Sequence, residues 1–199
     1  VDGCVFVEDP YTAGGAKAEV YLFGAHTVSW HAGGVDRLWL SHLSKMDGSA
    51  PIRGGVPIAW PQFADMGTLP LHGFARTSVW EVASVDCDDD GTSLTLGLRD
   101  SPETLAVWPY SFELLLTIAL TPATVEFSFT VCNTGDEAFS FTSCFHTYLR
   151  FDDTAPLELH GLGGASFVDK CDGNKIKTQD ADIITLEAES ARSGTDAGK

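Results

Sequence analysis

Apolar and polar residues alternate at every second position through the middle of the chain. The apolar members of three successive runs each keep one parity: Leu94, Leu96 and Leu98; Phe112, Leu114, Leu116, Ile118 and Leu120; Val125, Phe127, Phe129 and Val131. A period of two places such residues on one face of a β-strand, where a core can cover them. We therefore predict half-buried strands over 93–99, 112–120 and 125–131.

Short polar links between the apolar runs predict antiparallel connections. Asp88-Asp89-Asp90-Gly91 indicates a hairpin turn between a strand at 79–85 and the strand at 93–99. Thr121-Pro122-Ala123 has the same role for the next pair. Three further short strands are predicted at the ranges 19–23, 27–30 and 37–41.

One brief helix is predicted, which Ser101 caps, Pro102 begins and Trp108-Pro109 ends. Because no other segment has a long helical period, two packed antiparallel sheets are the natural way to bury so many one-sided strands. We expect an all-β chain with one sandwich domain over 1–186. The small and polar residues 187–199 are expected to form a tail.

Charge and composition exclude several classes of protein. The 199 residues carry 12 basic and 28 acidic side chains, a formal charge of −16 that would repel a nucleic acid. No apolar run approaches the roughly 18 residues of a membrane span, and the five cysteines show no zinc-site spacing. We expect a soluble, cytoplasmic or organellar protein without a metal or cofactor. An anionic ligand would need arginines gathered in one place.

Residues 53–76 form a long irregular segment rich in glycine, proline and aromatic residues, which is typical of a functional loop. Arg53 and Arg76 bracket it, and guanidinium groups suit bidentate contact with phosphate or carboxylate. The alternative is that each arginine pairs with an acidic residue of the chain. His72, beside Gly73, either approaches a ligand or hydrogen-bonds the loop to itself.

A strand is predicted over 139–151, with apolar residues at the odd positions and His146 on the polar face beside Tyr148 and Arg150. Histidine exchanges protons near neutral pH, so His146 is a candidate acid or base. The alternative is an ordinary surface histidine. Cys144 lies on the same face, but no spacing supports a cysteine hydrolase.

Taken together, these segments resemble the hexose-6-phosphate mutarotases, also called glucose-6-phosphate 1-epimerases and related to apospory-associated protein C, in the aldose 1-epimerase superfamily. The resemblance covers residues 37–169 and rests on the order and spacing of these motifs: Arg53-Gly54-Gly55-Val56-Pro57, Pro61-Gln62-Phe63, His72-Gly73-Phe74-Ala75-Arg76, Trp80-Glu81, Trp108-Pro109-Tyr110 and Phe145-His146-Thr147-Tyr148.

This resemblance implies a galactose-mutarotase-like β-supersandwich that interconverts the α and β anomers of a hexose 6-phosphate without a cofactor. His146 would be the general acid at the ring oxygen. Arg53 and Arg76 would bind substrate, and His72 would line the pocket beside them.

Three departures from the family pattern qualify that expectation. Leu71 stands where the family commonly has a polar residue, often glutamine. The family's substrate-binding aspartate, which follows the strand matching 183–186, has no counterpart here, and its catalytic glutamate is not found. We therefore expect a supersandwich that is incomplete at its C-terminus, whether or not the native chain continues past Lys199.

Two other kinds of function remain open on sequence grounds. One is a non-catalytic mutarotase-like module, a binding or structural subunit whose protein partner covers the incomplete sandwich. The other is a carbohydrate lyase or hydrolase, which would usually need a pair of carboxylates that the sequence does not indicate.

Overall fold

The computed structural model describes residues 3–8, 15–88, 91–151, 157–169, 172–173 and 175–186. It divides into two compact units, Val1–Arg150 and Phe151–Lys199. Each unit is described by itself.

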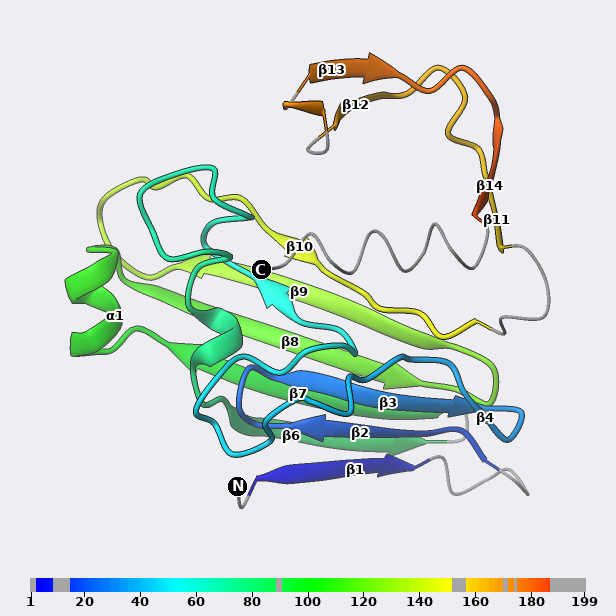
Figure 1. Ribbon diagram of the computed structural model, residues 1–199. Coiled ribbons are helices and arrows are strands. Elements are labelled where there is room, and N and C mark those ends of the chain that lie inside the picture. The colour runs from blue at the N-terminus through cyan, green and yellow to red at the C-terminus, as the bar shows by residue number, and fades with distance from the viewer. Residues whose placement is uncertain are drawn as a thin grey trace. The chain divides into compact units, whose positions relative to one another are not determined.

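Two four-stranded antiparallel sheets form the first unit, as the alternating sequence predicts (Figure 1). One sheet has the order β1-β2-β3-β4 and the other the order β6-β7-β8-β9. Their bounds are β1 Cys4–Glu8, β2 Lys17–Tyr21, β3 His26–Ala32, β4 Val35–Asp36, β6 Glu81–Asp88, β7 Gly91–Arg99, β8 Phe112–Leu120 and β9 Val125–Asn133.

The core of the first unit lies between these sheets, and β8 supplies much of it. The inward residues of β8 are each at most 1% exposed: Phe112, Leu114, Leu116, Ile118 and Leu120. They pack in one cluster with Leu94 and Leu96 of β7 and with Ala18 and Val20 of β2. Full burial of a large apolar side chain stabilises a fold by about 1.5–3 kcal/mol, so this face holds the two sheets together.

Helix α1 spans Pro102–Val107 and confirms the predicted start and end. The Thr104 backbone N–H donates to Ser101 Oγ at 3.3 Å, and the Ser101 N–H donates to Thr104 Oγ1 at 2.8 Å, a reciprocal cap. Trp108 then leaves the helix and is 8% exposed in the core cluster. The helix therefore ends at the point where Trp108 enters the core.

The predicted strand over 139–151 is wrong in extent, because strand pairing is limited to β10, Cys144–Phe145, which pairs with β5, Ile58–Ala59. Its parity is only partly right. Phe139 and Phe145 pack against the core, whereas Phe141 is 42% and Leu149 65% exposed.

The reason for the short strand is a change of partner along this segment. Cys144 pairs with Ala59, but Leu149 bridges to Leu38. The predicted strand over 37–41 is likewise reduced to bridges, since Leu38 contacts Leu149 and Leu40 contacts Gly54. The segments 38–40, 54–59 and 144–149 thus divide their backbone hydrogen bonds among one another, and no two of them form a long ladder.

The second unit contains two small antiparallel pairs. Strand β11, Leu157–His160, pairs with β14, Ile183–Leu186, and β12, Ser166–Asp169, pairs with β13, Lys175–Thr178. The strand predicted at 183–186 is therefore confirmed, and the predicted tail at 187–199 lies outside the described residues. Within the described ranges, no helix is both long and apolar enough to cross a membrane.

Candidate active site

Three backbone segments meet where the motifs of the sequence converge. The His146 N–H donates to the Pro57 carbonyl at 2.9 Å, and the Tyr148 N–H donates to the Gly55 carbonyl at 2.8 Å. On the other side, the Trp39 N–H donates to the Tyr148 carbonyl at 2.9 Å. These bonds fix the backbone that carries His146 against the glycine-rich end of the irregular loop.

The imidazole of His146 is half-buried between two other rings. The Tyr148 ring stacks on it, with ring centroids 4.9 Å apart and planes inclined by 22°. The His72 ring meets it edge-on, with centroids 5.6 Å apart and planes at 84°. The structure therefore brings together two histidines that the sequence places in different motifs.

His72 is held in an unusual backbone conformation by its neighbours. Its φ of +64° lies in the left-handed region, which costs a non-glycine residue about 1–2 kcal/mol. The His72 N–H donates to the Ala64 carbonyl at 3.0 Å, and its carbonyl accepts from Trp60 N–H at 3.3 Å. These loop bonds stabilise the strained residue.

The His72 side chain has a defined proton arrangement. The Ala64 N–H donates to His72 Nδ1 at 3.1 Å, so a neutral ring carries its proton on Nε2. His72 thus hydrogen-bonds the loop to itself, which is one of the two predicted alternatives, and it also contacts His146; its approach to a ligand stays a prediction. As a neutral group it presents a donor at Nε2, which suits contact with a hydroxyl or phosphate oxygen.

Gly73 allows the loop to approach the core closely enough to place His72. Its φ is +69°, and a Cβ at this position would overlap the backbone carbonyl of Trp60. The close approach is a parallel bridge between Trp60 and Gly73. Ala75 then begins a short 3₁₀ helix, Ala75–Thr77, which carries Arg76.

Five rings form a continuous row through the site. Phe63 contacts His72 at 5.4 Å between centroids, and at the other end Trp39 contacts Tyr148 at 5.8 Å. Trp39 is 40% exposed, because Leu38 and Leu40 on either side of it point inward. Aromatic faces beside proton-transfer groups are typical of a site for a small polar ligand with apolar C–H faces, such as a sugar.

The two predicted substrate-binding arginines have no acidic partner among the described residues. Within the described part of the chain, neither Arg53 nor Arg76 forms an ion pair, whereas Arg99 pairs with Glu113 at 2.6 Å and Arg150 lies 3.7 Å from Asp36. The Arg76 Nη2 donates to the Leu71 carbonyl at 2.8 Å. In a chain of net charge −16, two unneutralised guanidinium groups at one loop favour an anionic ligand.

The surroundings of Arg76 differ from those of Arg53. Burial lowers the pKa of Arg76, and the nearby Tyr148 phenol opposes this shift; arginine nonetheless remains charged at neutral pH. Arg53 is exposed, and its backbone is fixed by an N–H bond to Ser44 Oγ at 2.9 Å and by the Ser41 N–H at 3.0 Å. The described side-chain hydrogen bond of Arg76 is to the Leu71 carbonyl, next to His72, whereas the described bonds of Arg53 are backbone bonds.

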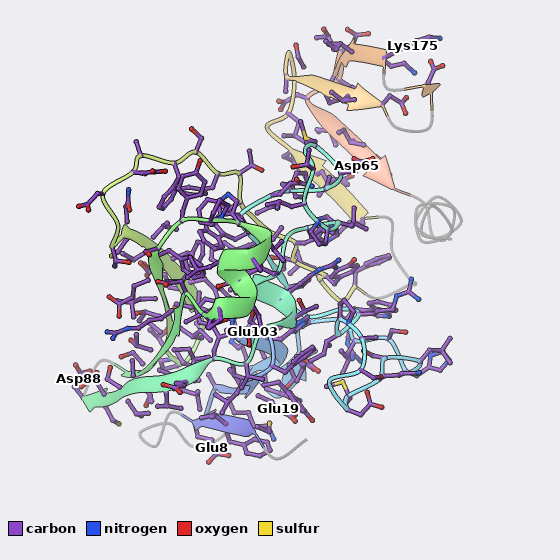
Figure 2. All side chains as sticks on the ribbon, turned by 90° about the vertical axis from the view of Figure 1, so that its left-hand side faces the viewer. Glu8, Glu19, Asp65, Asp88, Glu103 and Lys175 are labelled. Carbon is purple, nitrogen blue, oxygen red and sulfur yellow. The ribbon has the colours of Figure 1, made fainter. Side chains whose placement is uncertain are left out.

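A surface cavity of about 640 Å³ lies elsewhere, where α1 meets the outer face of β6, β7 and β8. Its arginine, Arg99, is already paired with Glu113, and Glu81 and Glu103 also line it. Figure 2 shows Glu103 on α1 and Glu8 and Asp88 at the margin of the sandwich. Because that cavity is acidic, it is poorly suited to phosphate, and the chemistry points to the two histidines.

The residues on the predicted polar face of the His146 segment take different positions in the structure. Tyr148 shares the His146 face as predicted, but Arg150 uses its Nε to donate to the Leu38 carbonyl at 3.1 Å. Trp39, whose ring extends the aromatic row at Tyr148, was not predicted as a candidate. Its predicted strand over 37–41 looked like ordinary sheet, and no signal in the sequence distinguished it.

No group of three or more potential metal ligands occurs among the residues that the structure describes. The model of the family described as aldose 1-epimerase matches residues 11–195. The chain belongs to the aldose 1-epimerase family.

Curated members of the aldose 1-epimerase family include two relatives that carry the name "Putative glucose-6-phosphate 1-epimerase". The one from Cenchrus ciliaris is 34% identical over 187 residues, which cover 86% of this chain and 55% of the relative. The one from Escherichia coli is 40% identical over 165 residues, which cover 80% of this chain and 53% of the relative. The chain thus spans about half the length of these relatives.

Solved structures confirm the galactose-mutarotase-like fold of this aldose 1-epimerase chain. A crystal structure from Salmonella typhimurium, described as a "putative mutarotase (YeaD)", is 33% identical, with a TM-score of 0.79 over 94% of this chain and 61% of that one. The Slr1438 protein from Synechocystis is 24% identical, with a TM-score of 0.76 over 89% of this chain and 64% of that one. The latter likeness concerns the fold alone.

Proposed function

We propose that this aldose 1-epimerase chain interconverts the α and β anomers of a hexose 6-phosphate by acid/base opening and closing of the sugar ring. The observation that carries the proposal is that Arg53 and Arg76, at the ends of the loop that brings His72 against His146, form no ion pair with any residue that the structure describes. The names of the curated relatives support the same substrate class.

Ring opening needs two proton transfers. An acid protonates the ring oxygen while a base removes the proton of the anomeric hydroxyl, and the aldehyde can then close from either face. His146 takes the acid role in the proposal, because its half-buried ring is held between Tyr148 and His72. The partner base, a glutamate in the family, is not assigned to a residue of this chain.

His72 and the aromatic row have binding roles in the proposal. The Nε2–H of neutral His72 donates to a substrate oxygen, since its Nδ1 already accepts from Ala64. Trp39 and Tyr148 offer their rings to the C–H face of the sugar. Leu71 is 55% exposed and offers no polar side chain, while its carbonyl holds Arg76.

Exchange NMR on glucose 6-phosphate tests the proposed reaction. The full-length protein is expected to accelerate anomer exchange over buffer, and His146→Ala is expected to slow it by about 10²- to 10⁴-fold, as for loss of a proton-transfer group. His160→Ala serves as the matched control, because His160 is an exposed histidine whose ring contacts Glu158 in the second unit. Equal rates for wild type and His146→Ala would exclude His146 as the acid.

Substrate selectivity is tested in the same assay. Glucose lacks the phosphate that the arginines are proposed to bind, so its exchange should be accelerated less at equal concentration than that of glucose 6-phosphate. An enzyme that acts equally well on both sugars would contradict the phosphate part of the proposal and leave the aldose 1-epimerase reaction in place.

A further inference from the structure

His26 is a buried titratable residue that the proposed reaction does not use. It begins β3, is 0% exposed, and its Nε2 lies 2.7 Å from the Gly54 carbonyl oxygen. A carbonyl can only accept, so Nε2 carries the proton and donates it. The neutral ring therefore has its lone pair on Nδ1.

The bond from His26 ends on the turn that follows Arg53. Gly54 and Gly55 both have positive φ, +112° and +61°. A Cβ on Gly54 would overlap the Trp39 carbonyl, and one on Gly55 would overlap the Thr27 carbonyl and lie 3.1 Å from His26 Nε2. The turn thus fits closely between β3 and the Trp39 segment, with His26 against it.

The other side of His26 lies close to Arg76. The charge of Arg76 contributes to lowering the pKa of His26. The backbone shows the same proximity, because the Gly24 N–H donates to the Ser78 carbonyl at 2.7 Å, and a Cβ on Gly24 would lie 2.6 Å from the Arg76 carbonyl oxygen. His26 is therefore situated between the elements that carry the two arginines.

Five buried side-chain polar atoms in the described part of the chain have no hydrogen-bond partner: Thr27 Oγ1, Trp30 Nε1, Trp60 Nε1 and two atoms at this junction. The two at the junction are His26 Nδ1, an acceptor in this tautomer, and Arg76 Nε, a donor. Burying such atoms costs free energy, so they are unusual in a core.

We propose that His26 is a positioning residue for the anion-binding arginines, fixing the Arg53–Gly55 turn through its Nε2–H and packing as a neutral ring beside Arg76. The inference rests on the proposed function in taking Arg53 and Arg76 as the groups that bind phosphate. His26 itself does not touch the substrate.

Neutrality is what makes histidine suitable at this place. Burial, as the largest cause, together with the charge of Arg76 lowers the pKa of His26 from 6.5 to about 4, and the bond to Gly54 opposes the shift. The ring is therefore uncharged at neutral pH. A lysine or arginine here would repel Arg76, whereas neutral imidazole combines a donor for Gly54 with a shape that fills the junction.

The test compares His26→Gln and His26→Leu in the full-length protein. The Gln side-chain amide can reach the Gly54 carbonyl as Nε2 does, whereas Leu fills space without a donor. Binding of glucose 6-phosphate and of inorganic phosphate is measured by calorimetry, at a temperature where circular dichroism shows every variant folded. The affinity for both ligands should fall by about tenfold in His26→Leu and by much less in His26→Gln.

Each outcome has a defined meaning. Folded His26→Leu that binds both ligands like wild type, or His26→Gln that is as weak as His26→Leu, would overturn the positioning role. A wild-type protein that binds neither ligand would overturn it as well. If wild type binds phosphate and the Leu variant does not, while anomer exchange is not accelerated, the epimerase proposal fails and the positioning role stands.

Discussion

The His72 ring points its edge at the His146 ring, with centroids 5.6 Å apart, although one residue belongs to a loop and the other follows the short strand β10. The left-handed backbone of His72 and the bond from Ala64 to its Nδ1 fix the direction of its Nε2–H. A histidine that donates from Nε2 cannot serve as a base through that atom while neutral. In the proposed reaction, His72 is accordingly a hydrogen-bond donor to the ligand and His146 is the acid.

We predict that His72→Asn separates these roles. The Asn side-chain oxygen can accept the Ala64 N–H in place of Nδ1, but the donor at Nε2 is lost. Ligand affinity should fall, seen as a higher KM for glucose 6-phosphate, while kcat changes little. An equal fall in kcat and kcat/KM, with KM unchanged, would instead indicate that His72 acts in the transition state.

The arginines should govern affinity for phosphate. Arg76→Lys keeps a charge but loses the planar fork, and Arg53→Ala removes a charge; each should weaken phosphate binding by about 10- to 100-fold. Isothermal calorimetry with inorganic phosphate measures the effect without the reaction. Arg99→Ala is the matched control, since Arg99 pairs with Glu113 in the separate cavity. An unchanged affinity in both site variants would contradict the role of the pair.

Trp39 should report on occupation of the site. Because it is 40% exposed and contacts Tyr148, a bound sugar should change its fluorescence, and Trp39→Phe should abolish that change. The Trp39→Phe variant should retain most of the affinity for the sugar. The affinity of Trp39→Leu should be several-fold lower, which corresponds to about 1 kcal/mol for an aromatic contact. Trp30→Phe, in β3, should leave the ligand-dependent change in fluorescence intact. If the Trp30→Phe variant lost that change, the sugar would bind near Trp30 and not at Trp39.

His26 should make stability depend on pH. Its pKa is lowered from 6.5 to about 4 in the folded protein, so between these pH values the unfolded chain binds a proton that the folded chain does not. The free energy of unfolding should therefore fall as pH decreases through this window, by roughly 3 kcal/mol from this group. Urea titrations across pH 4–7 should show that the free energy of unfolding falls less with decreasing pH in His26→Gln than in wild type. If the two proteins show the same dependence on pH, His26 is not the group responsible.

Gly73 should be sensitive to a single added methyl group. Gly73→Ala would force a left-handed backbone on alanine and push its Cβ onto the Trp60 carbonyl, at a cost of roughly 2–4 kcal/mol. Thermal unfolding measures the loss. Gly97→Ala is the control, because its Cβ would lie 3.7 Å from Leu115 Cδ2 in ordinary contact and should change stability by less than about 1 kcal/mol.

The local sequence pattern was sufficient to predict those elements whose residues depend only on near neighbours or on one common core. The alternation in β8 predicted its bounds and its buried face, because every second residue meets the same core. Ser101 and Pro102 predicted α1 because a helix cap depends on neighbours within one turn. The order of the motifs around Arg53, His72 and His146 was likewise a property of the sequence.

Tertiary structure decided what depends on several segments at once. The predicted strand over 139–151 is broken because its backbone changes partner from Ala59 to Leu38, a choice that no local period records. Sequence placed His72 and His146 in one site, but only packing set the edge-on contact and the tautomer of His72. Among the described residues it also left Arg53 and Arg76 without an ion-pair partner, and it buried His26 between their elements, since charge partners and burial are set by neighbours distant along the chain.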